Sequence, residues 1–134
     1  MRKSILTLGI AAVLTGVLAT CSMAYAADDK LAQIQESGKL KVGVEGTYPP
    51  YTYHDDNGEL TGFDVEVAKA IADKLGVEAD FTESDWDSLL AGIDSGRLDT
   101  VINAVSITPE REEKYDFAGP YFYITQQIVV AKDN

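Results

Sequence analysis

The feature that most constrains the fold of this chain is an alternation of strand-like and helix-like segments along its central part. Leu40, Val42 and Val44 alternate with other residues, which is the pattern of a half-buried strand. Apolar residues then recur at helical spacing in two later segments, and Gly76 and Gly96 are placed to end them. The order is strand, helix, strand, helix, strand, at residues 39–45, 63–75, 77–83, 86–95 and 98–104. This order predicts an α/β fold in which parallel strands are joined by right-handed crossovers.

The remaining elements are less regular. Residues 98–104 are nearly continuous in apolar side chains, so we expect them to form the central strand. A short helix is expected at residues 28–37, and a hairpin over residues 51–61 that turns where Asn-Gly tolerates positive φ. Residues 121–132 have the composition of a long strand, and the sequence stops soon after them. We therefore expect the sequence to be a fragment of a longer protein.

The predicted sheet places its binding site at one edge. Ligands on parallel sheets bind beyond the carboxyl ends of the strands. In this chain those ends are residues 45–50, 83–86 and 104–111. We expect these three loops to meet and to form a site.

The third loop has a combination of residues suited to binding an anion. Thr108 is a good N-cap and Pro109 a good first helical residue, so a helix is expected to begin there with Arg111 in its first turn. Free backbone N–H groups, the helix dipole and the guanidinium would then converge on one anion. Arginine binds a carboxylate through two parallel hydrogen bonds, so this loop predicts half of a receptor for an α-amino acid. The alternative is a solvated arginine paired with Glu112 or Glu113.

Residues 1–26 have the features of a secretory signal peptide. A positively charged start precedes an uncharged and mostly apolar stretch, and residues 24–26 form an A-x-A cleavage signal. The alternative is a lipoprotein signal in which Cys21 carries the lipid. Thr20 is larger than the residue usual before such a cysteine, which favours cleavage after Ala26. Both interpretations predict export, to the periplasm or the extracellular space.

Cleavage would leave residues 27–134, enough for one small domain with a modest core. Removal of Arg2 and Lys3 from the 11 basic residues leaves 9 of them against 22 acidic residues. This acidic excess argues against nucleic acid and anionic membrane surfaces as partners. The only cysteine and both methionines are removed as well, so no disulfide and no cysteine metal site are expected.

The hairpin turn carries a weak metal-binding pattern. Residues 55–58 hint at a calcium loop, but Tyr53 stands where the first carboxylate ligand belongs. We interpret these residues as a turn, and we expect no metal and no cofactor. His54, the only histidine, has no serine and acid at a spacing that would suggest a catalytic triad.

Seven short motifs lie at residues 43–50, 60–68, 84–87, 99–103, 106–111, 114–117 and 120–121. Together and in this order they resemble the polar amino acid-binding proteins of bacterial ABC transporters, the family-three periplasmic solute-binding proteins. Each motif alone is weak, and the set is specific. The sequence Glu-Gly-Thr-Tyr-Pro-Pro at residues 45–50 is most similar to the cystine-binding branch, in which a glutamine would be expected at Ala104.

The resemblance implies a type II periplasmic-binding-protein fold with two lobes joined by a hinge. Residues 27–134 would form the first lobe, with a parallel-rich sheet flanked by helices, and would end in the hinge strand. Each lobe supplies half of the site, and the acidic residue for the ligand's α-amino group would come from the second lobe. We expect residues 27–134 alone to bind weakly, because the contacts of the closed state are missing.

The resemblance also assigns roles around the third loop. Arg111 matches the family arginine that binds the ligand α-carboxylate, and Ser106 matches a serine or threonine on the same carboxylate. Ala104 matches a position where a small residue lets the ligand approach backbone carbonyls, and Val105 beside it falls in the site. From the residues alone, Ser106 is also explained as an ordinary loop serine and Ala104 as a packing residue.

Two aromatic residues and one acid complete the expected site. Tyr48 and Trp86 match positions whose rings enclose the ligand side chain, although Trp86 also fits the apolar face of its helix. Glu45 ends a strand at the site and either selects a cationic or amino group or is simply solvated. Asn103 is expected to order the following turn rather than to contact the ligand.

These features predict a monomeric extracytoplasmic binding protein that captures a polar amino acid, cystine or glutamine-like, and delivers it to a membrane ABC permease. One alternative is a periplasmic dehydratase of prephenate or arogenate, because the same family includes such enzymes. No catalytic pair is evident in residues 39–130. The other alternative is a ligand-sensing domain of a larger receptor.

Overall fold

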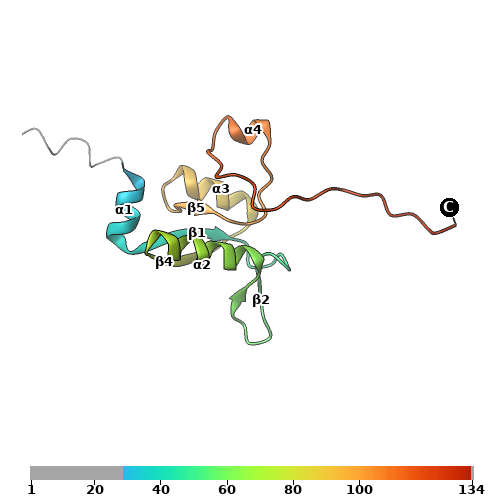
Figure 1. The fold of residues 1–134 in the computed structure, drawn as a ribbon, viewed down its shortest axis with the longest axis horizontal. Coiled ribbons are helices and arrows are strands. Elements are labelled where there is room, and N and C mark those ends of the chain that lie inside the picture. The colour runs from blue at the N-terminus through green and yellow to red at the C-terminus, as the bar shows by residue number, and fades with distance from the viewer. Residues whose placement is uncertain (1–28, 134) are drawn as a thin grey trace, which may run out of the picture.

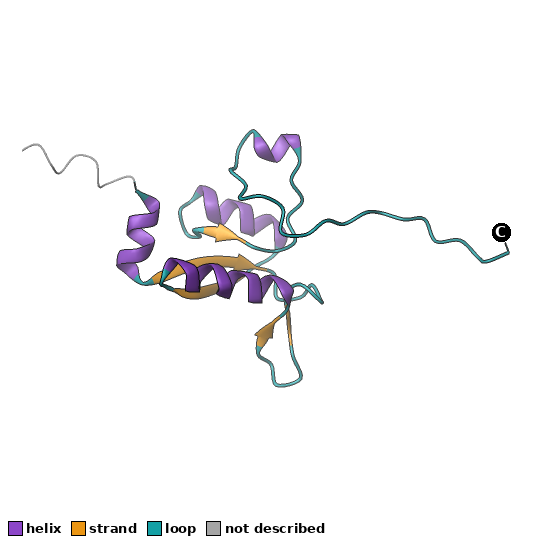
Figure 2. Ribbon diagram, in the orientation of Figure 1, coloured by secondary structure: helices purple, strands orange, loops and turns teal. Residues whose placement is uncertain are grey.

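The computed structural model describes residues 29–133, so the predicted signal peptide and the alternative lipid anchor at Cys21 lie outside the described residues. The elements in chain order are α1 (Lys30–Ser37), β1 (Lys39–Val44), β2 (Tyr53–His54), β3 (Leu60–Thr61), α2 (Phe63–Leu75), β4 (Glu78–Glu83), α3 (Trp86–Asp94), β5 (Thr100–Val101) and α4 (Pro109–Glu112). β4, β1 and β5 form a small sheet with α2 and α3 packed against it, β2 and β3 form a separate two-stranded sheet, and α4 lies on a loop away from both (Figures 1 and 2). Within residues 29–133, no helix has the length and apolar character needed to cross a membrane.

The main sheet confirms the predicted α/β fold with parallel strands. Its strand order is β4-β1-β5, and β1 pairs with both neighbours in parallel. The pairing of β1 with β4 covers both strands, from Lys39 opposite Glu78 to Val44 opposite Glu83. Parallel pairing places the carboxyl ends of all three strands at the same edge, where the predicted site lies.

The prediction that residues 98–104 form the central strand is wrong. Only Thr100 and Val101 pair, and β1 occupies the middle of the sheet. Leu98 and Ile102 are nevertheless buried, with 2% and 6% of their surface exposed. These side chains are buried because they pack in the core. An apolar run predicts that a segment is buried, but it does not predict where a strand lies in the sheet.

The helices α2 and α3 pack on opposite faces of β1. Side chains on a strand alternate between its two faces. Val42 and Val44 belong to the core cluster that contains Ala68 of α2. Gly43, between the two valines, faces Leu89 of α3 on the other side. The absence of a side chain at Gly43 allows α3 to approach the sheet closely.

The predicted hairpin is confirmed. Strands β2 and β3 pair antiparallel, with Tyr53 opposite Thr61. In the turn, one oxygen of Asp55 accepts the backbone N–H groups of Asn57 at 2.8 Å and Glu59 at 2.9 Å. These backbone hydrogen bonds, Glu59 first, lower the pKa of the Asp55 carboxyl. In residues 29–133, no group of histidine, cysteine and acidic side chains is arranged to hold a metal ion.

Residues 121–133 contain no strand, so the predicted long strand over residues 121–132 is wrong. The segment runs away from the rest of the chain (Figure 1), and Ile128 and Val129 are each 92% exposed. A strand needs a neighbouring strand to receive its backbone hydrogen bonds. None of the described strands lies beside this segment, so it does not form the strand that its composition favours.

The start of α2 is joined tightly to the loop before the hairpin. The backbone N–H of Phe63 donates to the Pro50 carbonyl at 3.0 Å, and that of Asp64 donates to the Tyr51 carbonyl at 3.0 Å. Gly62, which precedes the helix, has φ of 125°. A Cβ atom at Gly62 would overlap the Tyr51 carbonyl. This junction therefore requires glycine for two reasons, its backbone angle and the lack of space.

We predict that Gly62→Ala destabilises the fold more than Gly58→Ala. Both glycines have positive φ, so each substitution should cost on the order of 1–3 kcal/mol in backbone strain. The space around Gly58 is open, whereas a Cβ at Gly62 meets backbone atoms and should add roughly 1–3 kcal/mol. Urea denaturation of the two variants measures the difference, and equal losses would contradict the described junction.

Candidate functional site

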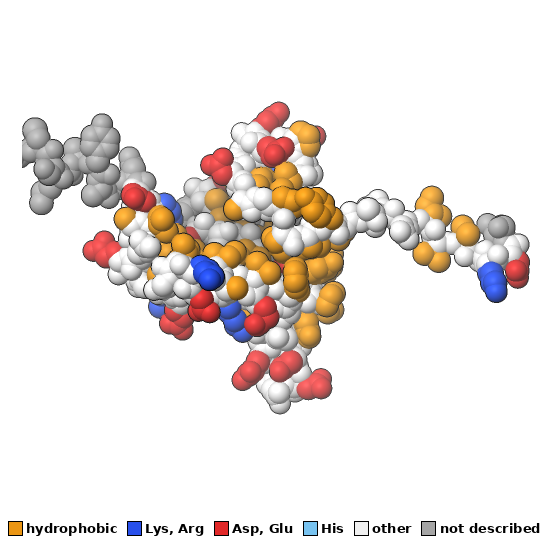
Figure 3. Space-filling model, viewed as in Figure 1, with side chains coloured by type: hydrophobic (Ala, Val, Ile, Leu, Met, Phe, Trp, Pro, Cys, Tyr) orange, Lys and Arg blue, Asp and Glu red, His pale blue; other side chains and the backbone are white. Residues whose placement is uncertain are grey.

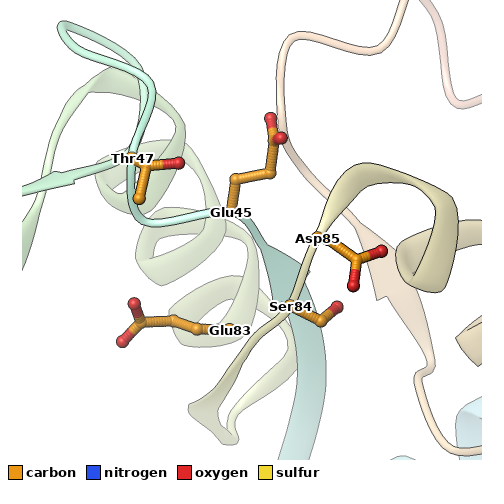
Figure 4. Close-up of a pocket in the computed structure, with 5 residues that line it drawn as sticks. All are labelled: Glu45, Thr47, Glu83, Ser84 and Asp85. Atoms are coloured by element: carbon orange, nitrogen blue, oxygen red, sulfur yellow. The ribbon is translucent and has the colours of Figure 1, made fainter.

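The carboxyl ends of β1 and β4 border a cavity of about 400 Å³. It is lined by Glu45, Thr47, Glu83, Ser84 and Asp85, which come from the end of β4 and from the loops after β1 and β4 (Figure 4). Sequence reasoning placed Glu45 here and did not single out the other four residues. Three of these five residues are acidic, which makes the surroundings of the cavity favourable for a cationic group.

The three acidic side chains do not point the same way. The Glu83 carboxylate extends away from Glu45 and Asp85 (Figure 4), and its Oε1 lies 3.3 Å from Nε2 of His54. His54 Nδ1 in turn lies 3.2 Å from the carbonyl of Gly46. Glu83 and His54 thus support the loop after β1, and Glu45 and Asp85 are left on the other side.

A buried asparagine holds the loop after β5 against the loop after β1. The Asn103 side-chain oxygen accepts the Glu45 N–H at 2.9 Å and the Thr52 hydroxyl at 3.0 Å. Its Nδ2 donates to the Glu45 carboxylate at 2.7 Å. Thr52 Oγ1 also accepts the Gly46 N–H at 3.3 Å. The Asn103 side chain therefore fixes both the backbone and the carboxylate of Glu45, which supports the expectation that it has an ordering role.

The predicted helix start at Thr108 and Pro109 is confirmed. Thr108 Oγ1 accepts the Arg111 N–H at 3.4 Å, and Pro109 is the first residue of α4. The helix is only four residues long, so its dipole adds little to anion binding. The guanidinium of Arg111 is the principal positive charge on this loop.

Arg111 lies beside another residue of the predicted site. Its Cζ is 5.2 Å from the centre of the Trp86 ring, within the range of a cation–π contact. Its Nη1 donates to the Ser106 carbonyl at 2.8 Å. Among residues 29–133, Arg111 forms no ion pair, so the alternative pairing with Glu112 or Glu113 is not observed. The guanidinium keeps donors available for an anion.

The turn of residues 104–106 has an unusual backbone. Ala104 has φ of 50°, which is rare for a residue other than glycine and costs on the order of 1 kcal/mol. Val105 is half-buried and Ser106 is exposed. A strained turn persists only where its surroundings hold it, and Asn103 supplies one such anchor.

Tyr48 is placed differently from Trp86. Its side chain is 45% exposed, and its ring centre is 5.1 Å from that of Tyr51. Trp86 is the first residue of α3, and its half-buried side chain lies against Arg111. Within the described residues no ring contact joins Tyr48 to Trp86. The structure thus brings together Trp86, Ser106 and Arg111, whereas the ring of Tyr48 packs beside that of Tyr51.

Asp85 has a structural task as well as a place in the cavity wall. It is the N-cap of α3, and its Oδ1 accepts the Ser88 N–H at 2.9 Å. This hydrogen bond is the main reason why the pKa of the Asp85 carboxyl is lowered. An aspartate directly before the first apolar residue of a helical pattern, just after a strand, is the sequence signal that could have identified this cap.

Asp64 is a buried acid that sequence reasoning missed. It lies in the first turn of α2, where an aspartate is usually solvated, yet its side chain is 0% exposed. Its Oδ1 accepts the Tyr121 hydroxyl at 3.1 Å. Burial raises the pKa of the Asp64 carboxyl, and burial together with the Asp64 charge raises the pKa of the Tyr121 phenol.

The site and the fold together define the class of protein: an α/β lobe that presents an arginine and an acidic cavity at the carboxyl edge of a parallel sheet. Residues 40–134 match the family described as bacterial extracellular solute-binding proteins, family 3. The chain belongs to this family, and its fold is that of a type II periplasmic-binding-protein lobe.

Two relatives are described as L-cystine-binding proteins. TcyJ of Escherichia coli strain K12 is 46% identical over 127 residues, which cover 90% of this chain and 48% of that protein. TcyA of Bacillus subtilis strain 168 is 50% identical over 107 residues, which cover 79% of this chain and 40% of that protein. The chain therefore spans about half the length, or less, of the curated relatives it matches.

Three solved structures show the same fold. The L-cystine solute receptor of Neisseria gonorrhoeae, in an unliganded open conformation, has a TM-score of 0.65 and 50% identity, covering 69% of this chain and 40% of that one. The arginine-bound form of domain 1 from TmArgBP has a TM-score of 0.66 and 38% identity, covering 67% and 71%. An ancestral cyclohexadienyl dehydratase has a TM-score of 0.66 and 41% identity, covering 69% and 39%.

We predict that Asp85→Ala destabilises the fold at neutral pH and that this loss becomes smaller in acid. Because the folded-state pKa of Asp85 is lowered, its ionised cap stabilises the fold above the ordinary pKa of 3.8. That contribution is lost as the pH falls through the lowered folded-state value. Thermal unfolding from pH 7 to pH 3 measures the difference between the wild type and the variant.

Asp85→Asn is the matched control, because asparagine caps a helix without a charge. Its melting temperature at pH 7 should lie between those of the wild type and Asp85→Ala, and its difference from Asp85→Ala should not follow the titration of a carboxyl at position 85. A wild-type advantage over Asp85→Ala that is the same at every pH would show that the charge of Asp85 contributes nothing to the cap.

Proposed function

We propose that this chain is the first lobe of the extracytoplasmic substrate-binding component of an amino acid ABC transporter. The observation that carries the proposal is Arg111, which lies over Trp86 beside the turn of residues 104–106 and has no acidic partner among the described residues. A guanidinium held in this way offers two parallel donors to the α-carboxylate of a ligand. Ser106 and the backbone of Ala104 and Val105 would contact the same part of the ligand.

The ligand we propose is cystine or a similar polar amino acid. The relatives described as L-cystine-binding proteins support this choice, as does the acidic cavity. Cystine carries two ammonium and two carboxylate groups, so it would present a cation to Glu45 and Asp85 while Arg111 holds a carboxylate. Trp86 and Tyr48 would cover the apolar disulfide portion of the ligand.

The proposed mechanism requires a second lobe. Residues 27–134 would dock the amino acid, the second lobe would close over it, and the permease would recognise the closed form, which is a population shift driven by tighter binding to that form. We propose that the protein acts as a monomer and reaches the periplasm or the extracellular space through a signal peptide at residues 1–26. A lipid on Cys21 is the alternative anchor.

We infer that the protein binds its ligand without transforming it. The family and the curated relatives are solute-binding proteins, which supports this inference. The similarity to an ancestral cyclohexadienyl dehydratase keeps a dehydratase as the second candidate. Turnover of prephenate or arogenate by the complete protein would decide in favour of that enzyme.

We predict that residues 27–134 bind cystine weakly, with a dissociation constant of roughly 1 mM, and that Arg111→Ala abolishes the binding. Arg111→Lys should weaken it at least about tenfold, since lysine cannot form the bidentate pair. Changes in the NMR spectrum during titration with cystine, or with glutamine where cystine is insoluble, measure these affinities. Lys69→Ala removes one surface charge on α2 and serves as the control. Unchanged binding by Arg111→Ala would refute the proposed carboxylate site.

We predict that Glu45→Gln changes selectivity more than overall affinity. The amide keeps an acceptor for the Asn103 side chain but removes the charge that would face a cationic group. Affinity for cystine should fall about fivefold relative to affinity for glutamine, which has no second ammonium group. Parallel titrations with the two amino acids test this, and an equal loss for both would mean that Glu45 does not select a cation.

A further inference from the structure

The segment that carries Arg111 is placed by its side chains. The N–H of Ile102 donates to the Gly43 carbonyl at 3.2 Å. Beyond that bond, within residues 29–133, no backbone–backbone hydrogen bond joins residues 104–133 to an earlier element. The helix α4 has only four residues, and the backbone hydrogen bonds around it are local. Side-chain contacts must therefore set the position of α4 relative to the sheet and its helices.

Two of these contacts attach the segment to opposite ends of α3. The guanidinium of Arg111 lies over the ring of Trp86, the first residue of α3. The Tyr115 hydroxyl donates to Oδ2 of Asp94, the last residue of α3, at 3.2 Å. A helix of nine residues is about 13 Å long. Two contacts that far apart fix the orientation of the segment, whereas one contact alone would let it pivot.

The helix α3 itself does not explain an aspartate at position 94. Asp94 is exposed at the C-terminal end of α3, where the helix dipole disfavours a negative charge. The last turn contains no basic residue that would compensate for it. The pKa of the Tyr115 phenol is raised, first by desolvation and then by its hydrogen bond to Asp94, so the hydroxyl keeps its proton and donates at neutral pH. The carboxylate therefore suits the contact with Tyr115 better than it suits the helix.

The orientation of the segment matters because Arg111 has acidic neighbours. Glu110, Glu112 and Glu113 flank it in sequence and are exposed, and acidic side chains gather around α4 (Figure 3). If the segment turned, one of these carboxylates could pair with the guanidinium and occupy the donors that a ligand needs. In the part of the chain that the structure describes, Arg111 pairs with none of them and faces Trp86 instead.

We propose that Tyr115 and Asp94 are positioning residues for Arg111. Their hydrogen bond fixes the far end of the arginine-bearing segment to the end of α3, so the guanidinium stays over Trp86 with its donors directed to a ligand. Neither residue touches the ligand. The part of this inference that concerns affinity rests on the proposed function, whereas the part that concerns the contact between Arg111 and Trp86 does not.

The first test needs no ligand. Trp86 is the only tryptophan in the sequence, so its indole N–H resonance, measured in residues 27–134, reports on the contact with Arg111. Arg111→Ala gives the position of this resonance without the guanidinium. Tyr115→Phe removes only the hydroxyl, and Asp94→Ala removes only its acceptor. We expect each of these two variants to move the indole resonance toward its position in Arg111→Ala.

The matched control is Tyr123→Phe. It makes the same chemical change at a tyrosine whose side chain is 85% exposed. We expect the indole resonance and the affinity of this variant to equal those of the wild type.

The second test is a titration with cystine, or with glutamine where cystine is insoluble. Tyr115→Phe and Asp94→Ala should each weaken binding about threefold, because an exposed hydrogen bond contributes modestly. The double variant should bind no more weakly than either single variant, because both substitutions remove the same hydrogen bond.

Urea denaturation separates positioning from a general loss of structure. Asp94→Ala removes a charge that the dipole of α3 disfavours, so its free energy of unfolding should stay equal to that of the wild type or rise while its affinity falls. A residue that only stabilised the fold would lower both together.

The outcomes also separate this proposal from the proposed function. An indole resonance that keeps its wild-type position in Tyr115→Phe and Asp94→Ala would overturn the positioning role, and so would losses of affinity that multiply in the double variant. Should Asp94→Ala not fold, the resonance in Tyr115→Phe still decides. If the wild-type chain binds no amino acid, the proposed function fails, and the indole resonance still shows whether the hydrogen bond holds Arg111 in place.

Discussion

The parallel pairing of β1 with β4 and β5 is the constraint on which the rest of the structure depends. It brings the carboxyl ends of three strands to one edge, so that loops far apart in sequence lie next to one another. The side chain of Asn103 then fixes two of these loops, because its oxygen and nitrogen bond to the backbone and the carboxylate of Glu45. Without that pairing, Glu45, Trp86 and Arg111 would share no common site.

The site combines a fixed cation with acidic groups at some distance from it. Arg111 is held by Trp86 and by the Ser106 carbonyl, and the acidic cavity is bordered by Glu45 and Asp85. This separation of charges suits a zwitterionic ligand that carries a further ammonium group. Under the proposed function, the groups on this lobe would contact only one side of the amino acid, so we expect the lobe alone to bind it weakly.

Much of the fold could be predicted from the sequence, because local patterns determined it. The helical spacing from Phe63 to Leu75 and the Asn-Gly turn predicted α2 and the hairpin correctly. The position of β5 and the state of residues 121–133 could not be predicted, since both depend on which strands lie alongside. Burial and β propensity are properties of a single segment, whereas strand pairing depends on two segments that lie side by side.

The site was predicted less completely than the fold. The helix start at Thr108 could be predicted from local sequence, but the contact of Arg111 with Trp86 depends on the tertiary packing of α3 and α4. Asp64 was missed for the same reason, because a first-turn aspartate becomes buried only when the segment at Tyr121 covers it. The cap at Asp85 had a local signal and could have been found.

The most direct test of the account is to locate the ligand on the lobe. In isotopically labelled residues 27–134, titrated with cystine, we expect the side-chain resonances of Arg111 and Trp86 and the amide of Ser106 to shift together and saturate at one concentration. Esterification of the ligand carboxylates should remove these shifts. Shifts confined to other parts of the sheet, or shifts that persist with the ester, would contradict the claim that Arg111 binds the α-carboxylate of an amino acid.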